Sequence, residues 1–257
     1  MRLLALDSAG GSSSVAIWRE GEVLVQAAVA LGHHSEQLLV LVEQCLAEAG
    51  VGLAQMDAIA CGRGPGAFTG VRLALSVAQG LAYAAGRPVI AVSNLQAAAE
   101  RATREPGAPS RLLVCHDARM HEVYWAAYER DAGGATRLVG AEAVGSPRSV
   151  ALPTAWSGAG AAWGVGTGFV AYAAELERLQ ARLARRVPLE GQAGEVARVA
   201  ARLGLGAAVA AEQAAPIYLR DEVVTPAPRG PAASIPPEPA GPSRTCHPYT
   251  LSCGERG

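Results

Sequence analysis

RLLALD (residues 2–7) is a short apolar run that ends in an aspartate, and RLLVCHD (residues 111–117) repeats this pattern in the second half of the chain. A polar turn and a second apolar stretch follow each run, namely SSVAIW (13–18) and EVYWAAYE (122–129). Apolar runs bounded by turn residues are typical of β-strands. The repetition therefore indicates two structurally related halves.

The first half continues with strands and helices in alternation. Gly50 and Gly86 each follow an apolar helical pattern and are typical helix C-terminal residues. We predict a third strand over 22–29, later strands over 57–62 and 88–92, and helices over 35–49, 69–85 and 94–102.

A Pro- and Gly-rich stretch, EPGAPS (105–110), separates the two halves. Beyond it we predict strands over 136–144 and 161–168, helices over 169–185 and 191–204, and a final segment over 215–223. The order strand-strand-strand-helix-strand-helix thus occurs twice. It is typical of the two-lobed actin-like ATPase fold (ASKHA, ribonuclease H-like), an α/β fold with one mixed sheet in each lobe. We predict one α/β lobe over 1–104 and a second, trimmed lobe over 105–224.

Residues 225–257 differ in composition from the rest of the chain. They are rich in Pro, Gly and Ser and poor in apolar residues, so we expect a disordered tail. Cys246, His247 and Cys253 lie within it, but their spacing matches no zinc-binding pattern, and we expect no metal site.

The overall composition excludes several classes of protein. The formal net charge is −1, so no global field attracts nucleic acid or an anionic membrane. All 22 basic residues are arginine, which rules out a P-loop lysine and Schiff-base chemistry. An aspartate appears too early for a signal peptide, and the most apolar helical stretch is too short to span a bilayer. We expect a cytoplasmic protein with no membrane contact.

The turn DSAGGSSS (7–14) is the first candidate site. In the actin-like fold this hairpin turn approaches nucleotide phosphates, and Asp7, Ser8 and Ser12 have suitable chemistry for a phosphate and its metal-water shell. The alternative is an ordinary polar β-turn in which Asp7 caps the strand end. The residues alone leave both interpretations open.

GRGPGAFTGVR (62–72) is the second candidate, because glycine-rich loops before a helix often hold phosphates. The third glycine of G-x-G-x-x-G is absent in either register, so we favour a rigid connector. Pro65 would stiffen its turn, and Thr69 is a suitable N-cap for the next helix. The residues of this loop are Gly62, Gly64, Pro65, Gly66, Phe68, Thr69, Gly70 and Arg72.

Helices 35–49 and 69–85 carry more apolar surface than a surface helix needs. Small residues recur every four positions in the second helix, which would let another helix approach closely. We therefore predict a partner interface, although packing of both helices within one core remains an equal alternative. The predicted interface residues are Leu38, Leu41, Cys45, Gly70, Ala74, Ala78 and Ala82.

Several motifs together resemble a known family. LALDSAGGSSSVAIW (4–18), HSEQLL (34–39), GRGPGAFTGVR (62–72), DARMHEVYWAAY (117–128) and PIYLRDEV (216–223) occur in the order seen in the TsaB (YeaZ) family. This family supplies the dimerisation subunit of the bacterial tRNA threonylcarbamoyladenosine machinery. The resemblance covers roughly residues 1–224 and implies the same actin-like fold. It also implies that the glycine loop positions the following helix and that the two apolar helices form the dimer face.

The resemblance further implies a role without catalysis. In this machinery a TsaD-type paralogue modifies adenosine 37 of tRNAs that read ANN codons, and its metal is held by two histidines. The matching stretch here, VSNLQAA (92–98), has Asn94 and Ala98 at those positions, and neither replaces an imidazole ligand. We expect no catalytic residues and no metal, with the TsaD-type protein and a TsaE-type ATPase as partners. The chain alone would form a homodimer, and tRNA would be reached through the complex.

The alternative function is an active small-molecule kinase or ATPase of the same fold. It would use Asp7 and Ser8 at the phosphates and would need a second carboxylate and an adenosine-binding loop, for which Asp117 and GVGTG (164–168) are the candidates. We expect no cofactor, and weak binding of ADP or ATP is left open.

Overall fold

The computed structural model describes residues 1–30, 34–156 and 161–220. Residues Met1–Asp221 form one compact unit. The predicted disordered tail, with Cys246, His247 and Cys253, lies outside the described residues. Among the helices of the described residues, none is both long enough and apolar enough to cross a membrane.

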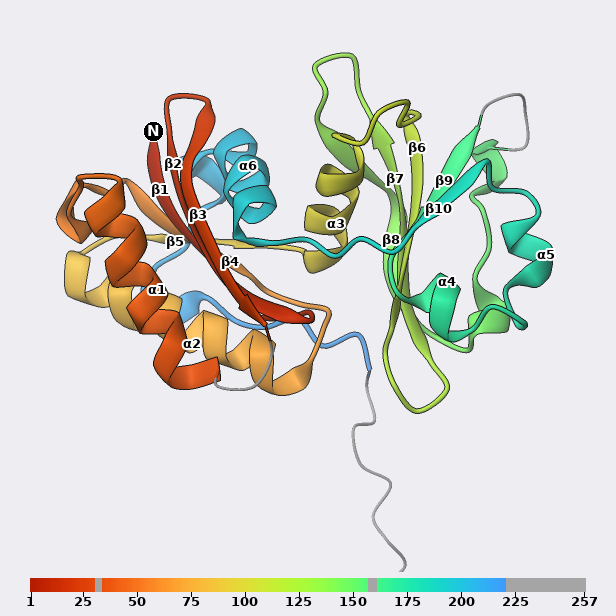
Figure 1. Cartoon of the computed structure of the whole chain (residues 1–257), viewed down its shortest axis with the longest axis horizontal. Helices are drawn as coiled ribbons and strands as arrows, with labels where there is room; N and C mark the ends of the chain where they lie inside the picture. Colours follow the sequence, from red (N-terminus) through yellow and green to blue (C-terminus); the bar gives the residue numbers. More distant parts are fainter. Residues whose placement is uncertain (31–33, 157–160, 221–257) are drawn as a thin grey trace, which may run out of the picture. The chain divides into compact units, whose positions relative to one another are not determined.

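The first sheet has five strands in the order β3-β2-β1-β4-β5 (Figure 1). The strand β1 at its centre pairs antiparallel with β2 and parallel with β4, which places Leu4 opposite both Ile17 and Ile59. The strands β1, β2 and β4 are buried on both faces, as the inner strands of a helix-covered sheet are. The strands are β1 (Arg2–Asp7), β2 (Ser12–Arg19), β3 (Glu22–Ala30), β4 (Ala58–Gly62) and β5 (Val89–Val92).

The second sheet repeats this topology, with the order β10-β9-β6-β7-β8. Its central strand β6 pairs antiparallel with β7 and parallel with β9, as β1 does with β2 and β4. The predicted fold class is therefore confirmed: the protein has the two-lobed actin-like α/β fold. The predicted order strand-strand-strand-helix-strand-helix does not recur in the second lobe, where the described residues between β8 and β9 form only short 3-10 helices. The strands are β6 (Arg111–Asp117), β7 (Val123–Arg130), β8 (Thr136–Gly145), β9 (Ala162–Val165) and β10 (Arg185–Val187).

The second lobe has shorter helices than the first, whereas its sheet has the same number of strands, five. The single helix predicted over 169–185 is wrong: the chain forms α4 (Gly168–Ala171), α5 (Glu177–Gln180) and then β10. The side-chain amide of the buried Gln180 donates to the carbonyl of Ala173 at 3.0 Å and accepts from Arg186 at 2.8 Å. The bond to Ala173 satisfies a carbonyl that a continuous helix would have paired with a backbone N–H.

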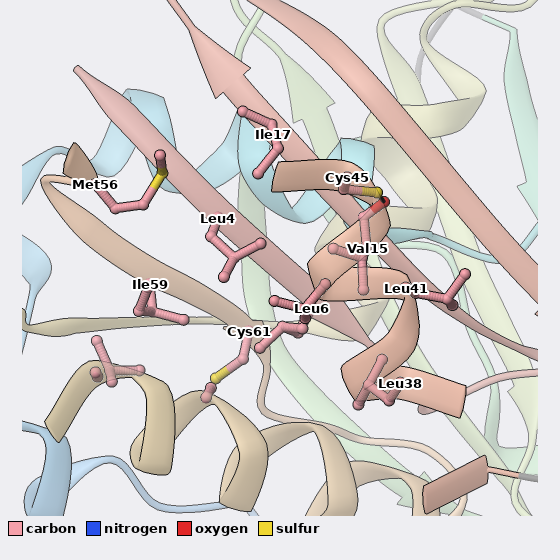
Figure 2. Close-up of a cluster of buried hydrophobic side chains, with 14 of the residues drawn as sticks. Leu4, Leu6, Val15, Ile17, Leu38, Leu41, Cys45, Met56, Ile59 and Cys61 are labelled. Carbon is pink, nitrogen blue, oxygen red and sulfur yellow. Dashed lines mark hydrogen bonds between the residues drawn. The ribbon is translucent and has the colours of Figure 1, made fainter. Parts of the chain in front are cut away.

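Two long helices cover one face of the first sheet, α1 (His34–Glu48) and α2 (Phe68–Ala85). Both match their predicted ranges within one residue at each end. Gly86 ends α2 in the left-handed conformation, with φ 63°. Figure 2 shows the apolar core that these elements share, including Leu4, Leu6, Val15, Ile17, Leu38, Leu41, Cys45, Met56, Ile59 and Cys61.

The helices α3 (Asn94–Ala102) and α6 (Ala193–Leu203) cross between the lobes. Although α3 precedes the second sheet in the chain, its Leu95 and Ala99 pack in the core of that sheet. Conversely, α6 follows the second sheet but packs on the first, with Val196 in the core beside Leu3. Each of these two helices therefore lies within the residue range of one predicted lobe and packs on the sheet of the other. Short 3-10 helices lie at Leu53–Gln55, Pro147–Ser149, Thr154–Trp156, Leu205–Ala207 and Ala211–Gln213.

Candidate functional site

Asp7 lies at the end of β1, where the first hairpin turn begins, and it is only 2% exposed. The side-chain amide of Asn94 donates a hydrogen bond to its Oδ1 at 2.6 Å. Burial raises the pKa of Asp7 to about 7, although the bond from Asn94 acts in the opposite direction. The carboxyl group is therefore buried and hydrogen-bonded within the protein.

Asn94 also joins Asp7 to the glycine-rich loop. Its Oδ1 accepts from the backbone N–H of Gly64 at 2.8 Å, and its own N–H donates to the carbonyl of Gly64 at 3.0 Å. A Cβ at Gly62 would overlap both Asp7 and Asn94, so only glycine fits at the end of β4. Thus Asn94 acts as a structural bridge between two segments of the first lobe.

The start of α2 packs against the backbone of the first hairpin turn. The N–H of Ala67 donates to the carbonyl of Ala9 at 2.8 Å, and a Cβ at Gly66 would lie 2.7 Å from the same oxygen. A Cβ at Gly70 would overlap the carbonyl of Ser8. The glycines of this loop therefore permit a close approach between two backbone segments.

The predicted phosphate-loop residues are enclosed by these contacts. Ser8 is 1% exposed, and its hydroxyl lies 2.7 Å from that of Ser13, while Ser12 is partly exposed. The predicted N-cap role of Thr69 is wrong, because α2 begins one residue earlier. Its N-cap position is Ala67, which makes no side-chain capping bond.

An aromatic cluster lies on the outer side of the glycine-rich loop. The guanidinium of Arg72 lies 3.3 Å from the ring centroid of Phe68, and its Nε donates to the hydroxyl of Tyr218 at 2.8 Å. The N–H of Ile217 donates to the carbonyl of Arg63 at 3.0 Å. Phe68 and Tyr218 are each about half exposed. The segment around 217–218 is thus held against the loop.

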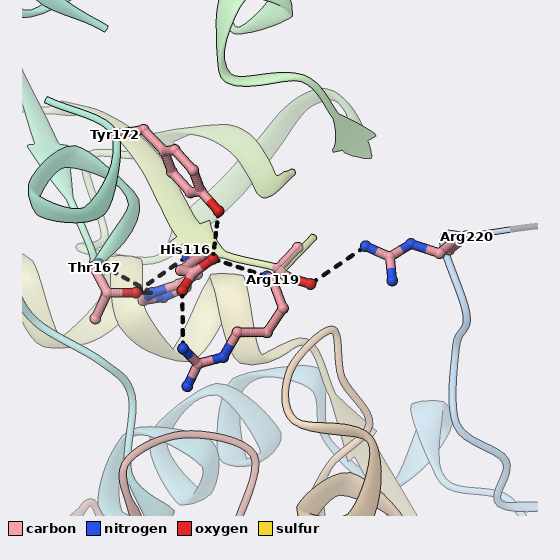
Figure 3. Close-up of polar contacts among 7 residues, drawn as sticks. His116, Arg119, Thr167, Tyr172 and Arg220 are labelled. Atoms are coloured by element: carbon pink, nitrogen blue, oxygen red, sulfur yellow. Dashed lines mark hydrogen bonds and ion pairs between the residues drawn. The ribbon is translucent and has the colours of Figure 1, made fainter. Parts of the chain in front are cut away.

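The second hairpin turn, between β6 and β7, occupies the equivalent place in the second sheet. Figure 3 shows the polar contacts around this turn. The carboxylate of Asp117 accepts from the hydroxyl of Tyr172 at 3.0 Å and from the N–H of Arg119 at 2.8 Å. Its other oxygen lies 3.4 Å from the guanidinium of Arg119. Arg220 donates to the carbonyl of Ala118 at 3.3 Å and pairs with Glu122.

Three consecutive residues of this turn have positive φ: Arg119 at 61°, Met120 at 54° and His121 at 59°. The sequence predicted a polar turn after residues 111–117 but not its left-handed backbone conformation, since none of these three residues is glycine or asparagine. Beside the turn, the backbone N–H of Thr167 lies 3.4 Å from Nδ1 of His116. Desolvation lowers the pKa of His116 to about 4, so its imidazole is neutral at pH 7.

The predicted interface residues lie in the core of the protein. Leu38, Leu41, Cys45, Gly70, Ala74, Ala78 and Ala82 are all buried. Leu38, Leu41, Cys45, Ala78 and Ala82 belong to the apolar core of the first lobe. This burial in the single chain favours the alternative that both helices pack within one core. A charge placed at position 41 or 78 would therefore disrupt folding.

The outer faces of α1 and α2 carry a different set of apolar side chains. Leu39 and Val40 on α1 are 47% and 49% exposed, and Tyr83 on α2 is 82% exposed. Leu73 and Val77 of α2 are partly exposed and pack against the edge of the apolar core. The outer face of α1 and α2 therefore carries exposed apolar side chains.

Fold and site together define an actin-like protein whose first hairpin turn is closed by its own side chains and backbone. The family model described as TsaD, tRNA N6-adenosine threonylcarbamoyltransferase, matches residues 25–227. The tRNA threonylcarbamoyladenosine biosynthesis protein TsaB of Escherichia coli (strain K12) is 38% identical over 237 residues, which cover 87% of this chain and 96% of that protein. This chain belongs to the TsaB family, within the wider group that the TsaD model describes.

Solved structures agree with this assignment. Two structures from Pseudomonas aeruginosa, one titled YeaZ and one described as an uncharacterized protein with similarity to peptidase YEAZ, are each 44% identical to this chain. Their TM-scores are 0.77 and 0.78, and the matches cover 85% of this chain and 99% of theirs.

Proposed function

We propose that this protein is a non-catalytic subunit that pairs with a TsaD-type transferase and activates it. The product would be N6-threonylcarbamoyladenosine at position 37 of tRNAs that read ANN codons. Membership of the TsaB family supports a role in the biosynthesis of this modification. A TsaE-type ATPase is the further partner in this proposal, the isolated chain is a homodimer, and tRNA is reached through the complex.

The observation that carries the proposal is the environment of positions 94 and 98. Asn94 uses its side chain to join Asp7 to Gly64. Ala98 is fully buried in the core around α3, and the backbone at Gly191 lies so close that a Cβ there would be 2.9 Å from the N of Ala98. The side-chain amide of Asn94 is used by Asp7 and Gly64, and the methyl group of Ala98 cannot bind a metal. At these two positions the chain therefore supplies no substitute for the paralogue's histidine pair.

The kinase or ATPase alternative receives no such support. It requires Asp7 to face nucleotide phosphates, but this carboxyl group is buried and bonded to Asn94. Asp117, its suggested second carboxylate, is bonded to Tyr172 and Arg119.

We propose that the outer face of α1 and α2 contacts the transferase. Apolar side chains that are half exposed in the single chain can be buried by a partner, and their removal from water stabilises a complex. The residues that define the test are Leu39 and Val40, because both are exposed and lie on one helix.

The experiment reconstitutes tRNA modification from the purified TsaD-type and TsaE-type proteins, threonylcarbamoyl-adenylate, tRNA and this chain. We expect no modification by this chain alone. The double variant Leu39→Glu/Val40→Glu should lower modification about tenfold or more and abolish co-elution with the transferase, because charges would be desolvated at the interface. Its melting temperature should match that of the wild type.

The matched control is Leu138→Glu, which places the same charge on a half-exposed leucine of β8 in the second lobe. This variant should retain binding and activation. If the double variant still binds and activates the transferase, the contact lies elsewhere. Modification by the isolated chain would overturn the non-catalytic assignment itself.

A further inference from the structure

The first hairpin turn is in contact with a carboxylate of its own chain. The backbone N–H of Gly11 donates to Oε2 of Glu190 at 2.9 Å. A Cβ at Gly10 would lie 3.0 Å from Cδ and Oε2 of Glu190, and one at Gly11 would lie 3.1 Å from Oε2. Glycines thus allow this turn to approach an anionic group closely, as glycine-rich loops that hold phosphates do.

Glu190 is fixed in this position by its neighbours in the segment between β10 and α6. Its carbonyl accepts from Arg101 at 2.9 Å. Gln192 accepts from Gln26 at 2.8 Å, and the N–H of Ala193 donates to the hydroxyl of Ser14 at 2.9 Å. The segment is therefore attached to β2, β3 and α3, and the carboxylate is held at the turn.

Among the described residues, no arginine forms an ion pair with the carboxylate of Glu190. Across residues 1–30, 34–156 and 161–220, no ion pair joins Glu190 to a basic side chain. Its electrostatic influence reaches both lobes: after the dominant effect of burial, it contributes to raising the pKa of Asp7, and it opposes the lowering of the pKa of His116 by desolvation. The N–H of Gly11 donates to this carboxylate as it would to a bound anion.

We propose that the Glu190 carboxylate occupies a latent phosphate-binding site formed by the Gly10–Gly11 turn and excludes phosphate groups from it. While Glu190 remains in contact with Gly11, its carboxylate therefore takes the place that a nucleotide phosphate would need at this turn. Removal of the carboxylate leaves a backbone donor and an open glycine turn, which is chemistry suited to a phosphate group. This inference concerns the isolated chain and does not depend on the proposed partner.

The test compares the full-length wild type with Glu190→Ala in titrations with inorganic phosphate and, separately, with ADP. The backbone amide signal of Gly11 in protein labelled with ¹⁵N-glycine reports binding at the turn. We expect roughly tenfold or tighter phosphate binding by Glu190→Ala than by the wild type, because the competing negative charge is gone. If Glu190→Ala binds ADP as tightly as inorganic phosphate, the turn recognises the phosphate group alone. If it binds ADP more tightly, the adenosine adds contacts. Both results support the latent site.

Two further variants keep the test decisive. Glu190→Gln retains the shape and the hydrogen-bond acceptor without the charge, so it should fold as the wild type does and let phosphate shift the Gly11 signal. Glu212→Gln removes an exposed carboxylate elsewhere and should behave as the wild type does. The proposal is overturned if folded Glu190→Ala and Glu190→Gln bind phosphate no more tightly than the wild type, or if binding leaves the Gly11 signal unmoved.

Discussion

The two hairpin turns of this protein occupy equivalent places in two sheets of the same topology, but they are held by different kinds of contact. The β1–β2 turn is enclosed by backbone segments that approach closely at Gly66 and Gly70. The β6–β7 turn is held by side chains, with Asp117 bonded to Tyr172 and Arg119. One topology therefore supports a turn that is buried at its start, from Asp7 to Ala9, in the first lobe and an exposed, polar turn in the second.

The difference follows from the elements that cover each sheet. In the first lobe the long helix α2 begins directly against the hairpin backbone, and the absence of a Cβ at Gly70 permits this. In the second lobe the corresponding cover is the short helix α4, and Tyr172 after it reaches Asp117 through its hydroxyl. A closed turn in this fold thus depends on helix placement and on glycine, whereas the strand order is common to both lobes.

The largest effect is expected from Gly70→Ala, which tests the close approach in the first lobe. The added Cβ would overlap the carbonyl of Ser8, so either α2 or the hairpin has to move. We expect the free energy of unfolding to fall by about 3 kcal/mol or more, measured by urea denaturation. Loss of the folded state would be the extreme form of the same result.

The control for this variant is Gly80→Ala in the same helix. Nothing lies within 4 Å of a Cβ at Gly80, so alanine should stabilise the helix by about 0.5–1 kcal/mol. If Gly70→Ala is as stable as the wild type, the hairpin and α2 do not approach as closely as the structure shows.

The pH dependence of stability provides the second test of the closed turn. The folded protein holds the proton of Asp7 up to about pH 7, whereas an unfolded chain releases it near its ordinary pKa of 3.8. Stability from this group is therefore fully present below about pH 4 and is lost as the pH rises through 7. The loss is at most about 1.4 kcal/mol per pH unit, and Asp7→Asn should remove it.

Asn94 offers a direct probe of this titration, because it is the only asparagine in the chain. Protein labelled with ¹⁵N-asparagine gives one side-chain amide pair, which is bonded to Asp7. Its signals should shift with a midpoint at about pH 7 in the wild type and show no such step in Asp7→Asn. A midpoint near pH 4 would contradict the buried, protonated state of Asp7.

Asn94→Ala tests the bridge between β1 and the glycine-rich loop. It removes bonds to Asp7 and Gly64 and leaves their buried groups unpaired. We expect a loss of about 2 kcal/mol in the free energy of unfolding. Gln44→Ala, which removes an exposed amide from α1, should cost less than about 0.5 kcal/mol. Equal stability of the two variants would show that the bridge contributes nothing.

The sequence predicted the strands well because their apolar runs are continuous and their turns are marked by Gly and Ser. It could not assign α3 and α6 to a sheet, since periodicity identifies an apolar face but not the surface that this face covers. The same ambiguity affected the stripe of small residues in α2. Gly70 in that stripe does permit close approach, but to the hairpin carbonyl of Ser8 and not to a second subunit.

The candidate site was predictable in its position but not in its contacts. Asp7 was identified from its place at a strand end, and Asn94 from the family resemblance. Their hydrogen bond joins residues 87 positions apart, and no local pattern indicates it. Glu190 was missed altogether, because it lies in a connecting segment and its contact with Gly11 arises only when that segment crosses to the first lobe.

The smallest effect is expected from Tyr172→Phe, which tests the side-chain contacts of the second hairpin. The tyrosine ring is 8% exposed and remains packed in the variant, so only the hydroxyl bond to Asp117 is lost. We expect a cost of about 1 kcal/mol, because Asp117 stays partly exposed and retains its bonds to Arg119. Tyr83→Phe, which removes a hydroxyl from a side chain that is 82% exposed, should leave stability unchanged. The Asn94 amide signals should not move in Tyr172→Phe, because the two turns are held by separate contacts. If Tyr172→Phe costs as much as Asn94→Ala, or shifts those signals, the second hairpin is coupled to the closed turn of the first lobe, and the contrast between them fails.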